Sequence, residues 1–222
     1  MEIAAIHGIM PKTVCYLMKN ITVSLIKINL NSSRRIKMPH KFANIHGYFD
    51  FDNLYEAITN QYPDGVYVEL GSWLGKSTCY MGELIKEKNI NAKFYVFDTF
   101  GGEVNAVDQQ EIVKECGGSI YKQFLKNMKD ADVLDCMIPL MISSLEGHEL
   151  LEDKSVDFVF IDTEHTYEMI KEELDKWYPK VKDGGIIAGH DYRDGVAKGV
   201  NEFFGGLGKT VGANRSSWVV NV

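Results

Sequence analysis

From Val66 onward the chain alternates short apolar runs with helix-forming segments, and this alternation is the feature that most limits its possible folds. Buried parallel strands joined by crossover helices give near-continuous apolar runs. We expect strands at residues 66–70, 93–98, 137–141, 156–162 and 184–190. We expect helices at residues 52–61, 76–88, 119–129, 145–151, 164–178 and 199–204, with a loop over 99–118. The pattern predicts a doubly wound α/β sheet, in which ligands bind at the carboxyl ends of the strands.

Charge and cysteine content narrow the class of protein. The formal net charge of −7 disfavours a nucleic-acid surface, because non-specific affinity for phosphates comes mainly from Lys and Arg. Four scattered cysteines without a C-x-x-C pair indicate neither a zinc site nor a disulfide framework, which favours a cytoplasmic protein. No apolar run in the sequence approaches the roughly 20 residues that span a bilayer. We therefore expect no membrane span and a small-molecule substrate.

Residues 1–41 are predicted to be an arm that precedes a single domain over residues 42–222. Apolar residues between Val14 and Leu25 recur at spacings of three and four, which is typical of a helical stripe. Such a stripe needs a partner, so we expect the arm either to cap the sheet or to build a homo-oligomer. The basic stretch that follows it, NSSRRIKMPHK, is interpreted as a connector with solvated charges.

The first expected strand ends in a glycine-containing turn, VELGSWLGKST, that leads into a helix. Gly71 and Gly75 let the backbone approach a ligand, and the first N–H groups of the helix can face an anion. Ser72 and Ser77 add hydroxyls, and Glu69 can accept a hydrogen bond from an ammonium group. The spacing E-x-G-x-x-x-G is not the dinucleotide fingerprint. The alternative is a turn that needs two glycines for its own backbone.

Asp98 ends the second expected strand, one βαβ unit further along the chain. An acid at this position can accept hydrogen bonds from both hydroxyls of a ribose. The alternative is that Asp98 caps its own loop. We expect Thr99, the next residue, and Ser144, which follows the third strand, to complete the contacts with the same ligand.

The segments IDTEHTY and AGHDY place two acids and two histidines after the fourth and fifth strands. Asp162 and Asp191 are a natural site for a hard divalent cation, and a neighbouring imidazole can take a proton from a hydroxyl. We expect His165 and His190 to converge on the same edge. The alternative is that Asp162 caps the following helix, His165 packs on it and Asp191 caps a turn.

With these motifs the sequence, from about Asp50 to Val222, resembles the class I S-adenosylmethionine-dependent methyltransferases, and specifically the metal-dependent small-molecule O-methyltransferases. VELGSWLGKST resembles the glycine motif of the catechol O-methyltransferase group. FDTFGG and IDTEHTY with PKVKDGGIIAGHDY are similar to segments of macrocin-type sugar O-methyltransferases. The resemblance implies a Rossmann-like sheet of seven strands whose last strands are antiparallel, and residues 208–213 and 216–222 suit that closing hairpin.

The resemblance further implies S-adenosylmethionine as cofactor, Asp162 and Asp191 as metal ligands, and His165 as general base. His190 departs from the pattern, since an acid stands there in the macrocin-type enzymes. Mg²⁺ prefers oxygen ligands, so either His190 stays off the metal or the site accepts Mn²⁺ or another borderline metal. We predict methylation of a hydroxyl on a small molecule or a sugar or glycan precursor. The alternatives are a metal-independent N-methyl or aminopropyl transferase and a non-catalytic cofactor-binding interaction module.

Overall fold

The computed structural model describes residues 40–222, so the predicted helix of the N-terminal arm and its role in an oligomer lie outside the described residues. Seven strands form one sheet in the order β3-β2-β1-β4-β5-β7-β6. Strands β1 to β5 run parallel, whereas β7 is antiparallel to β5 and to β6. The strands are β1 Val66–Leu70, β2 Lys93–Asp98, β3 Ile138–Met141, β4 Val156–Ile161, β5 Val181–Gly189, β6 Gly212–Asn214 and β7 Ser217–Asn221. The doubly wound sheet with a closing hairpin is therefore confirmed.

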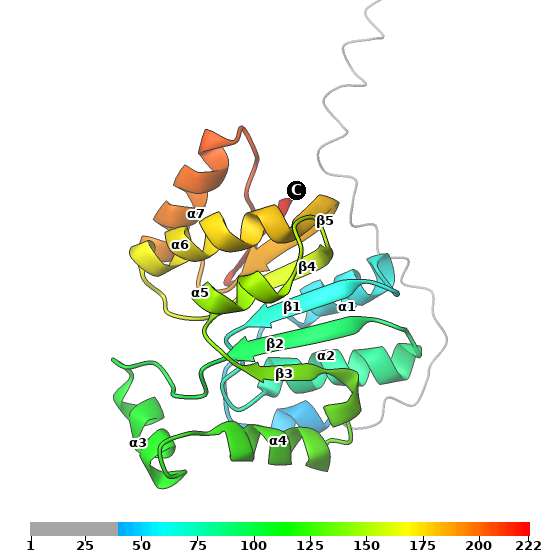
Figure 1. Ribbon diagram of the computed structural model, residues 1–222, viewed down its shortest axis with the longest axis vertical. Coiled ribbons are helices and arrows are strands. Elements are labelled where there is room, and N and C mark those ends of the chain that lie inside the picture. The colour runs from blue at the N-terminus through cyan, green and yellow to red at the C-terminus, as the bar shows by residue number, and fades with distance from the viewer. Residues whose placement is uncertain (1–39) are drawn as a thin grey trace, which may run out of the picture. The chain divides into compact units, whose positions relative to one another are not determined.

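Helices cover both faces of the sheet, as Figure 1 shows. One face packs against α1, α2 and α4, and the other against α6 and α7. The α-helices are α1 Asp52–Gln61, α2 Lys76–Lys88, α3 Val107–Glu115, α4 Tyr121–Asp130, α5 Ser144–Gly147, α6 Tyr167–Trp177 and α7 Asp194–Gly206. Short 3-10 turns occur at Lys41–Asn44, Leu134–Cys136, His148–Leu150 and Tyr178–Lys180. Among the described residues, no helix combines the length and apolar character that a membrane crossing requires.

Alternation of side chains along the central strands builds the two halves of the core. Successive residues of a strand point to opposite faces, so Phe158 and Phe160 of β4 pack toward α1, whereas Val159 and Ile161 pack toward α6. Trp177 at the end of α6 is fully buried in the second half. With both faces covered, the polar edge at the carboxyl ends of the strands is left to form a site.

Several boundaries differ from the sequence prediction, and the helix expected over residues 199–204 is the longer α7, which begins at Asp194 and ends at Gly206. Residues 99–118, expected as a loop, contain α3, of which only Val113 is buried, so its apolar periodicity is weak. Helix α6 starts at Tyr167 because the hydroxyl of Thr166 accepts a hydrogen bond from the Met169 amide and caps it. Strand β5 begins at Val181, which pairs with Val156 before an irregularity in the register.

Candidate active site

A cavity of about 500 Å³ opens at the carboxyl ends of β1, β4 and β5. This is the edge at which doubly wound sheets bind ligands, and the volume is in the range of small-molecule sites. Polar side chains dominate its wall. The lining residues are Gly47, Tyr48, Gly71, Ser72, Trp73, Lys76, Ser77, Gln109, Asp162, His190, Asp191, Arg193 and Ser216. The cavity thus joins the glycine turn after β1 to the acids and histidine after β4 and β5.

The glycines of the β1–α2 turn are required by the chain's own packing. Gly71 and Gly75 have φ values of 81° and 88°, in the region that favours glycine. A Cβ at Gly71 would lie 2.0 Å from the carbonyl oxygen of Asp162, and one at Gly75 would lie 2.5 Å from Cε of Met128. The turn therefore packs closely against the loop after β4 at Gly71 and against α4 at Gly75. Helix α2 then begins without a side-chain cap, which leaves its first N–H groups open to a ligand at this wall.

Asp98 fastens the glycine turn to the loop after β2. Its Oδ2 accepts hydrogen bonds from the backbone amides of Ser72 at 2.7 Å and Trp73 at 2.9 Å, and from the Ser72 hydroxyl at 3.1 Å. Within residues 40–222, its Oδ1 accepts only from the Phe100 amide, at 2.6 Å. The loop-capping interpretation is thus observed. A carboxylate oxygen has two acceptor positions, so Oδ1 keeps one for a ribose hydroxyl, and that contact stays a prediction.

Glu69 lies beneath the turn, with its side chain turned into the core. It is 1% exposed, and it accepts hydrogen bonds from the hydroxyls of Tyr55 at 2.9 Å and Thr78 at 2.5 Å. Burial is the main cause that raises the pKa of this carboxyl to about 7, and the charge of Asp162 raises it further. Glu69 is not among the residues that line the cavity. Glu69 lies near the end of β1, as the sequence predicts, and its contact with the cofactor stays a prediction.

We expect Glu69→Gln to gain stability relative to the wild type as the pH rises. An acid with a higher pKa in the folded than in the unfolded state disfavours folding progressively between the two values, here from about 4.5 to about 7. The amide has no proton to lose. Across this pH range the unfolding free energy of the wild type should therefore fall, relative to that of the variant, by on the order of 3 kcal/mol. Urea denaturation at acidic and alkaline pH measures it.

Glu87→Gln, which removes an exposed acid from α2, is the matched control and should leave the pH dependence of stability unchanged. A Glu69→Gln variant whose stability difference from the wild type is the same at every pH contradicts the assignment of a buried, ionisable carboxyl.

Two further predicted cofactor residues are not among the residues that line the cavity. Thr99 is exposed, and its hydroxyl accepts from the Gly101 amide at 3.4 Å. Ser144, at the start of α5, is 8% exposed and donates to Glu173 Oε1 at 2.5 Å. Glu173 also accepts from the Thr163 hydroxyl, which ties the loop after β4 to α6. Their roles toward the cofactor stay predictions.

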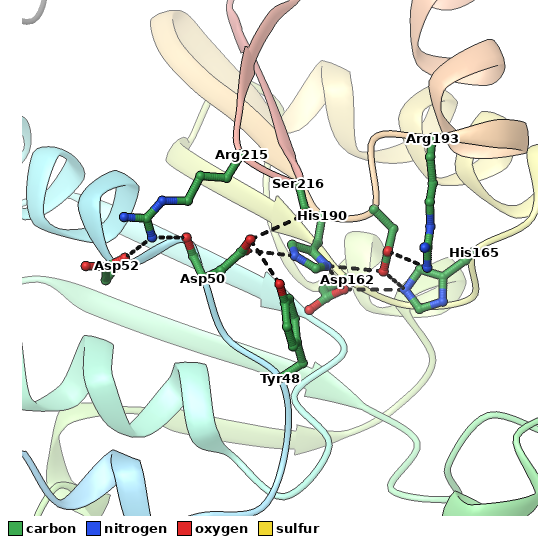
Figure 2. A network of polar contacts seen from close by, with 10 residues as sticks. Tyr48, Asp50, Asp52, Asp162, His165, His190, Arg193, Arg215 and Ser216 are labelled. Carbon is green, nitrogen blue, oxygen red and sulfur yellow. Dashed lines mark hydrogen bonds and ion pairs between the residues drawn. The ribbon is translucent and has the colours of Figure 1, made fainter.

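The two acids and two histidines after β4 and β5 do converge, and Figure 2 shows Asp162, His165 and His190 close together. Nε2 of His165 lies 2.9 Å from Oδ2 of Asp191 and 3.5 Å from Oδ1 of Asp162. Nδ1 of His190 lies 3.1 Å from the same Asp191 oxygen and 3.7 Å from the same Asp162 oxygen. The carboxylates thus stand between two imidazoles, one 39% exposed (His165) and one 6% exposed (His190). The capping alternative does not hold for Asp162, because Thr166 caps α6.

The surroundings of His165 favour its protonated form. Its pKa is raised, first by the hydrogen bond to Asp162 and then by the charges of Asp162, Asp191 and Glu103. Glu103 Oε2 lies 3.8 Å from Nδ1 of the ring. Arg193 Nη2 balances the cluster from the other side, 2.9 Å from Oδ1 of Asp191. His165 therefore lies where a proton is readily held.

The donor set fits a divalent cation. Asp162, His165 and Asp191 each offer a ligand atom, and these atoms lie within 4.8 Å of one another. Ligand atoms on one divalent ion are separated by up to roughly 4 Å, so small side-chain movements close the site. His190 adds a second nitrogen beside the same two oxygens. A mixed oxygen and nitrogen set suits Mn²⁺ and other borderline ions better than Mg²⁺.

Several cavity residues were not predicted from the sequence. Gly47 and Tyr48 precede α1, Gln109 lies in α3, and Arg193 and Ser216 follow β5 and β6. None stands at the carboxyl end of a parallel strand except Arg193, which comes four residues after β5. The fold brings these residues to the cavity from separate parts of the chain, and no sequence motif includes them.

The fold and the cavity at the carboxyl ends of β1, β4 and β5 define a class I methyltransferase. A family described as a methyltransferase domain matches residues 68–192, and the chain belongs to this family. Members of this class use S-adenosylmethionine, so the protein is an S-adenosylmethionine-dependent methyltransferase. No curated protein sequence matches the chain.

Solved structures share the fold at low sequence identity. The O-methyltransferase NovP is 18% identical, with a TM-score of 0.57 over 82% of this chain and 79% of that chain. CalS11, a TDP-rhamnose 3'-O-methyltransferase, is 17% identical, with a TM-score of 0.53 over 77% and 78%. A putative caffeoyl-CoA O-methyltransferase from Staphylococcus aureus is 13% identical, with a TM-score of 0.53 over 82% and 88%.

Proposed function

We propose that the protein transfers the methyl group of S-adenosylmethionine to a hydroxyl oxygen of a small-molecule or sugar acceptor, with help from a divalent cation. The observation that carries this proposal is the convergence of Asp162, Asp191, His165 and His190 beside the cavity wall that holds the glycine turn. Cofactor and proton acceptor would then be neighbours. The O-methyltransferases among the structural neighbours support oxygen as the methylated atom.

Asp162, Asp191 and His190 would hold the cation, which supplies positive charge that lowers the pKa of an acceptor hydroxyl. His165, the more exposed imidazole, would stay off the cation and take the hydroxyl proton in its neutral form, because a cation held by Asp162 and Asp191 would offset the carboxylate charges that raise its pKa. S-adenosylmethionine would supply the methyl group, with the carbon–oxygen bond formed as the carbon–sulfur bond breaks, and S-adenosylhomocysteine would be released. Asp191 orients His165 through its 2.9 Å contact with Nε2. Positioning of the two reactants in line supplies much of the remaining rate.

The polar lining of the cavity favours a polar acceptor such as a sugar hydroxyl. Lys76, Gln109, Arg193 and Ser216 all present hydrogen-bonding groups to it. A catechol-like phenol is the second class to examine, with Tyr48 and Trp73 as the aromatic surfaces of the wall.

The proposal is tested by measuring transfer of a radiolabelled methyl group. The acceptors are panels of sugars, nucleotide sugars and catechols, each with and without EDTA. We expect labelled product from a hydroxyl acceptor, lost with EDTA and restored by Mn²⁺. Transfer to an amine, or transfer to a hydroxyl that EDTA leaves unchanged, contradicts the metal-assisted O-methylation.

A further inference from the structure

Asp50 contacts the buried histidine of the site from outside the parallel strands. Its Oδ1 lies 3.0 Å from Nε2 of His190, a contact that joins the segment before α1 to the end of β5. The His190 ring is 6% exposed and packs near the rings of Tyr48 and Phe51, with centroids at 5.5 Å and 5.3 Å. Little room remains for the ring to turn.

Asp50 is itself fixed in place. Its Oδ2 accepts hydrogen bonds from the hydroxyls of Tyr48 at 3.3 Å and Ser216 at 3.1 Å. Its backbone carbonyl accepts from Nη1 of Arg215 at 2.6 Å. Figure 2 shows this chain of contacts running from Arg215 through Asp50 to His190. The carboxylate is therefore aimed at the imidazole by groups on the β6–β7 hairpin and on the segment before α1.

The direction of the Asp50–His190 hydrogen bond follows from its chemistry. An ionised carboxylate only accepts, so the proton of this bond belongs to Nε2 of His190. The other ring nitrogen, Nδ1, faces Oδ2 of Asp191 and Oδ1 of Asp162; by the same rule it donates to Asp191 here, and it would give up that proton to bind a cation. A carboxylate that accepts from one nitrogen of a metal-binding histidine fixes the tautomer and the ring orientation, and makes the other nitrogen more basic.

We propose that Asp50 is a positioning residue that holds His190 with Nδ1 toward Asp162 and Asp191, so that a cation between these carboxylates gains a nitrogen ligand. The inference rests on the metal site of the proposed function and adds to it a residue from outside the strand ends. The nitrogen ligand directs the site toward borderline ions rather than Mg²⁺.

Mn²⁺ binding to the full chain, followed by electron paramagnetic resonance, tests this inference. The wild type should show coupling of Mn²⁺ to a ligand nitrogen that survives His165→Ala and is lost in His190→Ala. Asp50→Ala should weaken Mn²⁺ binding by about 10- to 100-fold and reduce the nitrogen coupling. Asp50→Asn keeps a neutral acceptor of the same shape, so its Mn²⁺ affinity should lie between those of the wild type and Asp50→Ala.

Asp64→Ala is the matched control, because it removes an exposed acid from the turn between α1 and β1, away from the contacts that fix Asp50. It should bind Mn²⁺ as the wild type does. If Asp50→Ala also binds Mn²⁺ with unchanged affinity and nitrogen coupling, the positioning role is overturned and the metal site stands. If the wild type binds no Mn²⁺ at all, both the positioning role and the metal part of the proposed function fail.

Discussion

Asp98→Ala is expected to weaken S-adenosylmethionine binding by at least about 100-fold, a loss of about 2.7 kcal/mol. The substitution removes the acceptor proposed for the ribose, and hydrogen bonds to a charged group are each worth about 1.5–3 kcal/mol. It also releases the Ser72 and Trp73 amides that shape the cavity wall. Calorimetric titration of the cofactor into the variant measures the loss.

Two further variants distinguish the loss of a contact with the ligand from a disturbed glycine turn. Ser72→Ala removes one hydrogen bond to the same carboxylate and leaves the carboxylate in place, so it should weaken cofactor binding less than Asp98→Ala does. Asp98→Asn keeps one oxygen acceptor and should bind with intermediate affinity. Cofactor binding that is unchanged in a folded Asp98→Ala protein would place the ribose elsewhere.

Asp162→Asn is expected to lower Mn²⁺ affinity by at least about 100-fold, because it removes one of two anionic ligands. Asp162 is the better probe of the pair, since Asp191 also binds Arg193 and two imidazoles at 2.9 to 3.1 Å. The melting temperature without metal shows whether the variant is folded, because Asp162 also contacts the rings of His165 and His190. Calorimetry with Mn²⁺ and thermal unfolding without it give the two values.

Glu164→Gln controls for the charge change, since this acid follows Asp162 closely in the chain, is exposed and lies outside the cavity lining. It should bind Mn²⁺ with wild-type affinity. Equal Mn²⁺ affinity of Asp162→Asn and the wild type would remove Asp162 from the set of metal ligands.

The strands and the convergence of the acids and histidines were predictable from sequence for a physical reason. Parallel strands buried on both faces are near-continuously apolar, and their carboxyl ends meet at one edge. Residues that directly follow β4 and β5 therefore had to be neighbours. The same logic identified Asp98, which ends β2 and contacts the glycine turn as well as the loop that follows it.

Side-chain direction and long-range packing were not predictable in this way. Glu69 and Ser144 stand at the expected places, yet each turns toward a buried partner and not toward the cavity. Asp50 reaches His190 across 140 residues of chain, through the packing of α1 against the sheet. Its own context, FDFDN, carries no motif.

The most direct test of the account is a calorimetric titration of S-adenosylmethionine into the wild-type chain, with and without Mn²⁺. We predict saturable binding at one site per chain, present without metal because the glycine turn and Asp98 do not depend on it. Absence of binding under both conditions would contradict the assignment of the cavity as the cofactor site and, with it, the proposed methyl transfer.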